Sequence, residues 1–350
     1  MLRLSIILVL CLSNSACFYM QAAAGQWQVL QKREPINEVI DDPETSPALA
    51  GRLQMLVEAR DFSIEQLGLP DNKSYRSFAE IGRDYVVWNV IAAPEFSLQP
   101  RQWCFPVAGC VAYRGYFAQP DAEKAAERLS RKGFDVAVGG VAAYSTLGKF
   151  DDPILSSMLQ WRDHDLVALL FHELAHQVVY VKDDTAFNES FATAVEQFGL
   201  QRWLEVTGEA GAYTQYLDRR RHRDAISEAI VNARADLEGI YQLDLDVTEM
   251  RARKQQRLQQ LAADIHAIAD DAGISLLGWM SGDLNNAHLV STALYEAYVP
   301  QFKTLFDTCQ RDFDCFYAAA ARLADLDRET RDRVLATGNL QRFARGTDEK

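Results

Sequence analysis

Two histidines one helical turn apart, within a strongly apolar segment, constrain the fold of this chain more than any other feature. The segment contains the motif H-E-x-x-H, formed by His172, Glu173 and His176. Leu and Val residues around it predict a helix over residues 163–181. At about 100° per residue, both imidazoles lie on one helix face and can bind one metal ion. Glu173 lies beside them, where it can take a proton from a water molecule that the metal activates.

The motif is specific because histidine is scarce, with only six in 350 residues. The alternative is a pair of histidines satisfied by hydrogen bonds on a helix surface, and an apolar helix fits that interpretation poorly. A catalytic zinc site also needs a third protein ligand. The metzincin continuation is missing, because Val179 and Lys182 occupy its glycine and histidine positions.

Asn188-Glu189 offers a different third ligand. The sequence predicts a turn at Asp183-Asp184 and a second helix from about Ala186, antiparallel to the first. Such a pair could bring Glu189 to His172 and His176, which is the gluzincin arrangement, although the spacing is shorter than in the best-known gluzincins. We expect one Zn²⁺ per chain; the alternative is that Glu189 is a solvated helix carboxylate.

Further site residues are less well defined by sequence. Glu196 follows Glu189 by two turns and could orient a ligand histidine, although Asp163, Asp183 and Asp184 compete for that role. A hydrolase of this type also needs a group that stabilises the developing oxyanion, usually Tyr, His or Arg. The candidates are Tyr295, Tyr298 and His288, with Tyr113, Tyr116 and Tyr144 as alternatives.

The N-terminus has the pattern of a signal peptide over residues 1–16. A short positive start precedes the apolar run Leu4–Leu12, which is too short to span a bilayer of about 30 Å. Ser15-Ala16-Cys17 resembles the end of a lipobox and makes Cys17 the lipidation candidate. The alternatives are cleavage after Ala24, which lies far from the apolar run, and an uncleaved anchor. No later segment approaches 18 uninterrupted apolar residues.

Export changes the interpretation of the other cysteines, because disulfides persist in oxidising compartments. Cys11 leaves with the signal peptide, and the remaining four form two pairs with C-x5-C spacing. Two local disulfides are the simplest interpretation, with metal binding as the competitor. The expected pairs are Cys104 with Cys110 and Cys309 with Cys315, which leaves His and Glu to bind zinc.

The rest of the chain predicts one α+β domain over residues 17–350. Hydrophobic residues make up 48%, enough for a large core. We expect a helical and sheet part to about residue 160, active-site helices over 163–205 and a C-terminal helical part over 211–340. The sheet should be small and antiparallel, with strand candidates at 84–92, 102–107, 111–117 and 134–144.

The charge balance argues against nucleic-acid binding. Net charge is −13 and the pI is about 5.0. Two basic clusters, at 219–223 and 251–257, fit solvated helix faces, with contact to anionic lipid head groups as the alternative.

Several segments of the chain carry a resemblance to a known family. They run from Tyr19-Met20-Gln21-Ala22 with Gly25-Gln26, through Cys104–Cys110, Tyr113–Phe117 and Val138–Gly148, to His172–His176 with Asn188-Glu189. Together they resemble the bacterial predicted aminopeptidase lipoproteins, a group of zincin-like proteins. The resemblance implies a mainly helical, gluzincin-like zinc metallopeptidase with a small embedded sheet and a lipid anchor, acting on peptides.

Two further expectations follow. Phe18 stands where Gram-negative sorting rules place Asp in lipoproteins kept at the inner membrane, which favours the outer membrane, facing the periplasm. Zincins bind peptide along a sheet edge, which gives the strand Gly139-Gly140-Val141 a candidate role.

Two functions compete. The first is a zinc-dependent peptidase, by resemblance an aminopeptidase, with Glu173 as general base. The second is a non-catalytic zinc-binding envelope lipoprotein that acts as a scaffold or assembly factor. Glu173 favours the enzyme, because a structural metal site needs only ligands.

Overall fold

The computed structural model describes residues 18–105, 109–146, 148–273, 283–292, 298–338 and 340–344. The signal peptide, Cys17 and Tyr295 therefore lie outside the described residues. Residues 18–31 are helical, and most of the chain after residue 160 is helical too. The helices are α2 (Ile36–Asp41), α3 (Pro47–Glu65), α4 (Gln119–Ser130), α5 (Asp163–Ala175), α6 (Thr185–Val206), α7 (Ala210–Tyr241), α8 (Val247–Ala272), α9 (Asn286–Thr292), α10 (Val299–Thr308), α11 (Phe313–Ala324), α12 (Arg328–Thr337) and α13 (Gln341–Ala344), with a 3₁₀ turn at Ser156–Gln160.

The strands are β1 (Arg33–Pro35), β2 (Ser77–Ala79), β3 (Val87–Pro94), β4 (Trp103–Phe105), β5 (Gly109–Val111), β6 (Tyr113–Tyr116), β7 (Phe134–Val141) and β8 (Ile154–Leu155). Within the described residues they form three small sheets instead of the single antiparallel sheet that the sequence predicted. One has the order β6-β3-β7 and is antiparallel, β4 pairs with β5, and β1-β2-β8 contains a parallel pair between β2 and β8. Strand pairing joins residues far apart in sequence, so periodicity alone could not assign it.

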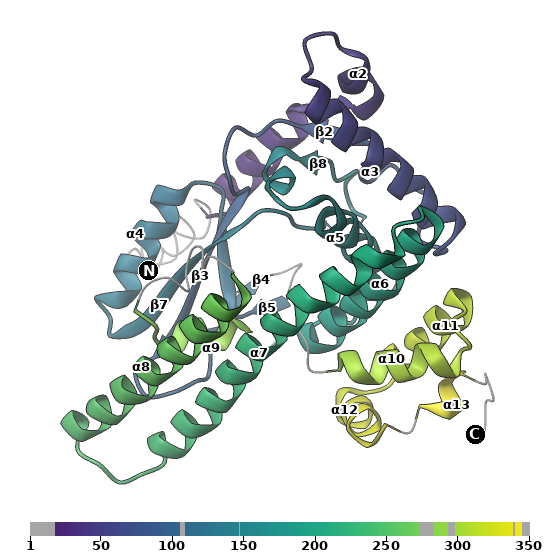
Figure 1. Ribbon diagram of the computed structural model, residues 1–350. Helices are drawn as coiled ribbons and strands as arrows, with labels where there is room; N and C mark the ends of the chain where they lie inside the picture. Colours follow the sequence, from purple (N-terminus) through teal and green to yellow (C-terminus); the bar gives the residue numbers. More distant parts are fainter. Residues whose placement is uncertain are drawn as a thin grey trace, which may run out of the picture.

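Helices α5 and α6 lie against each other in the main core (Figure 1). Their buried faces carry large apolar side chains, including Phe171, Leu174, Phe187 and Phe191. Figure 1 shows α3 along one side of this pair and the C-terminal helices α10–α13 beside α6. Burial of the apolar faces, rather than helix propensity, holds the pair together and fixes the spacing between the two helices.

Helices α7 and α8 form a long antiparallel hairpin that reaches the β6-β3-β7 sheet (Figure 1). Leu237, Leu261 and Ile265 are among the residues of its own apolar seam. Asn286, which is fully buried, fixes α9 to the loop after β3 by donating from its amide to the carbonyls of Pro94, Glu95 and Ser97. Tyr241 on α7 donates its hydroxyl to Oδ1 of the same Asn286 at 2.8 Å, so α9 connects the hairpin to the sheet.

Two local disulfides join the cysteines in the spacing that the sequence suggested. Cys104 is bonded to Cys110 across the β4-β5 pair, and Cys309 to Cys315 between α10 and α11. In the part of the chain that the structure describes, no helix is both long and apolar enough to cross a bilayer.

Candidate metal centre

His172 and His176 face the same carboxylate. The Nε2 atom of His172 lies 3.3 Å from Glu189 Oε2, and Nε2 of His176 lies 3.7 Å from Glu189 Oε1. One ligand atom from each of the three residues lies within 4.8 Å of the other two. A tetrahedral zinc with bonds of ~2.0–2.1 Å separates its ligand atoms by ~3.3 Å, so the donor set and spacing fit a zinc ion.

The connection between the two helices is longer than predicted, because the first helix ends early. Helix α5 ends at Ala175 instead of 181, and His176 is its cap. The side chain of Asn188 then holds the returning backbone: Val181 N–H donates to Oδ1, and Nδ2 donates to the Val181 carbonyl, both at 2.7 Å. This early end and the Asn188 clamp let Glu189 reach the histidines across a short spacing.

Asp184 starts α6 rather than orienting a histidine. Its carboxylate accepts from the Phe187 N–H at 3.1 Å and receives both the Nε and Nη2 donors of Arg331, at 3.0 and 2.6 Å. Both side chains of this ion pair are only 3% exposed. The pair fixes α12 to the start of α6, one turn before Glu189.

The other two competitors also lie in structural positions. Asp163 binds Arg52 at 2.8 Å, and Asp183 occupies a left-handed backbone position with φ 63°. Neither of these features connects the aspartate to the metal-binding histidines.

Glu196 is the carboxylate that contacts a metal-site histidine, through the ring nitrogen that does not face the metal position. Its Oε2 lies 3.0 Å from Nδ1 of His172, which leaves Nε2 of that ring for the metal. Oε1 accepts from the Tyr216 hydroxyl at 2.6 Å and from Arg220 at 3.4 Å, both on α7. Burial opposes the charge on Glu196, but His172 and Arg220 lower its pKa to about 2.

The ligand pKa values follow from the same contacts. Burial lowers the pKa of His172, but hydrogen bonds to Glu189 and Glu196 outweigh it and raise this pKa to about 10. Burial and the neighbouring His172 charge lower the pKa of His176 to about 4. The pKa of Glu189 is lowered, because its contacts with both histidines outweigh burial.

Glu173 is buried beside the ligands. Burial, together with the charges of Glu189, Asp152 and Glu196, raises its pKa to about 7 against the opposing effect of His172. A general base works best when its pKa lies near the working pH.

Tyr75 lies in a loop after α3, close enough for the charge of Glu173 to act on its phenol. It is fully buried, has φ 61°, and burial and the Glu173 charge raise its pKa well above the usual value. Left-handed geometry is rare for a bulky residue and concentrates at functional sites. Arg60, also fully buried, fixes this loop by donating to the carbonyls of Ser74 and Pro70. No sequence pattern marks Tyr75.

The candidate oxyanion groups lie in different places. Tyr298 donates its hydroxyl to Asp332, and His288 contacts Asn285 of its own turn through Nδ1. Tyr116 is buried among residues of the β6-β3-β7 sheet and α4, and Tyr144 donates to Gln26. None of these contacts involves the metal group.

Tyr113 and Tyr180 instead lie near Glu189. Burial and then the Glu189 charge raise the pKa of each phenol. Both side chains are partly exposed, so a substrate could reach them. Tyr180 was missed by sequence analysis, although it lies four residues after His176.

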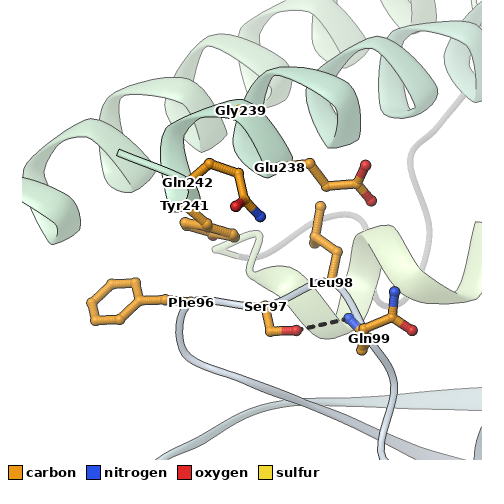
Figure 2. Close-up of a pocket in the computed structure, with 8 residues that line it drawn as sticks. All are labelled: Phe96, Ser97, Leu98, Gln99, Glu238, Gly239, Tyr241 and Gln242. Carbon is orange, nitrogen blue, oxygen red and sulfur yellow. Dashed lines mark hydrogen bonds between the residues drawn. The ribbon is translucent and has the colours of Figure 1, made fainter. Parts of the chain in front are cut away.

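A cavity of about 530 Å³ lies apart from this centre (Figure 2). Leu98 and Tyr241 are among the residues that line it, between the loop after β3 and the end of α7. No residue of the metal group contributes to its lining.

The chain matches one known protein family. No curated protein and no solved structure matches the chain. A family model described as "Putative aminopeptidase" matches residues 17–335, which include the whole metal centre, α7 with its contacts to Glu196, and Arg331. Because that match covers most of its length, the chain belongs to this aminopeptidase family.

Proposed function

We propose that the chain is a zinc-dependent peptidase with a gluzincin-like site on a zincin-like fold. The observation that carries the proposal is the convergence of His172, His176 and Glu189 beside the buried Glu173. The family name suggests peptidase activity and, more narrowly, an aminopeptidase.

In this proposal, His172, His176 and Glu189 hold one Zn²⁺, and Glu196 fixes the orientation of His172. When bound, the metal would act as a Lewis acid that activates water and polarises the scissile carbonyl. Glu173 would accept the proton of the attacking water and donate it to the leaving amine. Its raised pKa suits both steps, because it can hold and release a proton near neutral pH.

Tyr113 and Tyr180 are our candidates for oxyanion stabilisation. Both lie near Glu189 and are partly exposed, and a phenol is protonated at neutral pH, as a hydrogen-bond donor requires. They replace Tyr298 and His288 in that role, because those side chains make the other contacts described above.

The outer edge of β7 is our candidate for binding the peptide backbone. Val141 accepts from the Val86 N–H on the inner side, so Val138 and Gly140 direct their backbone groups outward. Within the described ranges, no strand pairs with this edge. An extended peptide could add there as a further strand.

The test is Glu173→Gln in the purified protein. We expect zinc content near one per chain in both forms and a loss of peptide cleavage of about 10²–10⁴-fold in the variant, because the general base is removed while the ligands stay. Glu205→Gln, an exposed carboxylate on the same α6 helix as Glu189, is the matched control and should keep full activity.

Equal cleavage by wild type and Glu173→Gln would contradict the mechanism. Stoichiometric zinc without any cleavage by the wild type would support the scaffold function instead. Peptides with free and blocked N-termini, compared in the same assay, separate an aminopeptidase from an endopeptidase.

We also propose an envelope location, with Cys17 as the lipidated first residue of the mature chain. The contacts of the following residues support it over cleavage after Ala24. Phe18 lies under the Arg114 guanidinium, and Gln21 exchanges hydrogen bonds with the backbone of Gly115 and Phe117. Cleavage after Ala24 would remove both side chains from the fold.

A further inference from the structure

The helix of residues 18–31 contains no Asp, Glu, Lys or Arg, although such residues make up 24% of the chain. A surface helix that faces water normally carries charge on its outer face. The next cations along the chain are Lys32 and Arg33, immediately after the helix. The outer face of this helix therefore differs from that of an ordinary surface helix, because it carries no charged residue.

The inner face is fixed to the sheet. Phe18 stacks 4.0 Å from the Arg114 guanidinium, and Gln21 binds the Gly115 carbonyl at 3.3 Å and the Phe117 N–H at 3.2 Å. At Gly25, an added Cβ would lie 2.1 Å from the Phe117 ring, so helix and strand end are in close contact. These contacts define which side of the helix faces away from the protein.

The outer face carries exposed apolar side chains from its start to Trp27, and the exposed polar residues Gln28 and Gln31 follow at its end. Met20 is 69% exposed and Trp27 62%, and Tyr19 is 45% exposed. Ala23 and Ala24 are exposed between them, and each of the five residues has another of them three or four positions away, so all five lie on one side of the helix. Exposed aromatic and apolar side chains gathered in this way mark an interaction surface.

The position in the chain indicates which surface covers it. The helix begins at Phe18, the residue directly after Cys17 in the sequence, so no linker separates the proposed anchor from the helix. At about 1.5 Å per residue, Met20 lies only ~3 Å and Trp27 ~14 Å along the helix from its first residue, Phe18. An anchor at Cys17 therefore brings this face to the bilayer surface, where Trp and Tyr are favoured at the level of the head groups.

We propose that the outer face of this helix, formed by Tyr19, Met20, Ala23, Ala24 and Trp27, lies in the interface of the lipid bilayer. This inference rests on the proposed N-terminal anchorage and is independent of the peptidase activity. An amphipathic helix in this position buries its apolar face ~5–10 Å into the head-group boundary. Because the inner face is fixed to β6, docking sets the orientation of the whole protein relative to the membrane.

The experiment uses anchored protein purified from membranes and reconstituted into vesicles of phosphatidylethanolamine and phosphatidylglycerol. Tryptophan emission is compared with and without lipids brominated in their acyl chains, which quench only residues within the bilayer. We expect wild-type quenching to be mostly lost in Trp27→Phe and unchanged in Trp161→Phe, which removes an exposed tryptophan outside this helix.

A second pair of variants leaves Trp27 in place. Met20→Glu puts a charge into the face and should abolish most of the quenching, whereas Val231→Glu, at an exposed apolar position on α7, should not. Thermal melting of each variant checks the fold. Anchored protein that shows no Trp27-dependent quenching overturns the inference, as does protein that does not bind the vesicles. The peptidase assay separates either result from failure of the proposed activity.

Discussion

His172 makes a contact through each of its ring nitrogens, and the two contacts differ in kind. Nδ1 binds Glu196, while Nε2 faces Glu189 and the position of the metal. Glu196 is itself held by Tyr216 and Arg220. The orientation of one ligand therefore depends on a chain of polar contacts that crosses from α5 through α6 to α7.

Glu196→Gln should lower zinc affinity by about 10–100-fold, the usual effect of losing a carboxylate that orients a ligand histidine. Competition with a chromophoric chelator measures the affinity, and Glu205→Gln serves as control. Unchanged affinity would show that Glu196 does not orient His172.

Zinc binding should release a proton from His172. Its pKa is raised to about 10 in the metal-free protein, so the ring is protonated at pH 7 and must lose that proton to bind a metal. Apparent zinc affinity should therefore rise about tenfold per pH unit between pH 8 and 9. In that range His172 is the only one of the ligands and carboxylates described above whose shifted pKa still requires loss of a proton. Calorimetry in buffers of different ionisation enthalpy counts the protons released; a count of zero would contradict the raised pKa.

At the scale of elements, the sequence predicts a helix or strand well where its ends are set by residues close by in the chain. Helix α8 begins after Asp246, whose side chain caps its start, and ends at Gly273 in a left-handed conformation, and both are helix signals that a sequence shows directly. The three sheets and the early end of α5 depend on distant contacts, such as the pairing of β2 with β8 and the clamp by Asn188.

Arg331→Met should destabilise the fold by about 3–5 kcal/mol, because it leaves the carboxylate of Asp184 buried without its partner. Arg333→Met on the same helix removes an exposed ion pair with Glu329 and should cost about 0–1 kcal/mol. Denaturant unfolding measures both, and similar losses in the two variants would refute the role of the Asp184 pair.

At the scale of the whole molecule, the metal centre lies where several helices meet. Its ligands come from α5 and α6, its supporting carboxylate contacts α7, and Arg331 connects the start of α6 to α12. Metal binding should therefore stabilise the entire fold rather than one helix pair.

Removal of zinc with a chelator should lower the melting temperature. Free zinc at about 100 times its Kd should raise the free energy of unfolding by ~2.7 kcal/mol, because the ion binds the folded state only. Calorimetric melting with and without zinc measures this, and Glu189→Ala should lose most of the zinc dependence. A melting temperature that ignores zinc would argue against the site.

The sequence by itself determined what lies within a few turns of one helix. The spacing of His172 and His176 places two imidazoles on one face, and Asn188-Glu189 indicated the third ligand, because helical periodicity is a local property. Only the tertiary structure decided which distant groups complete the site. Glu196 was one carboxylate among four until packing placed it on His172, and Tyr75, Tyr216 and Arg331 had no signal at all. Their contacts depend on how helices and loops pack, and that information is spread over the whole chain.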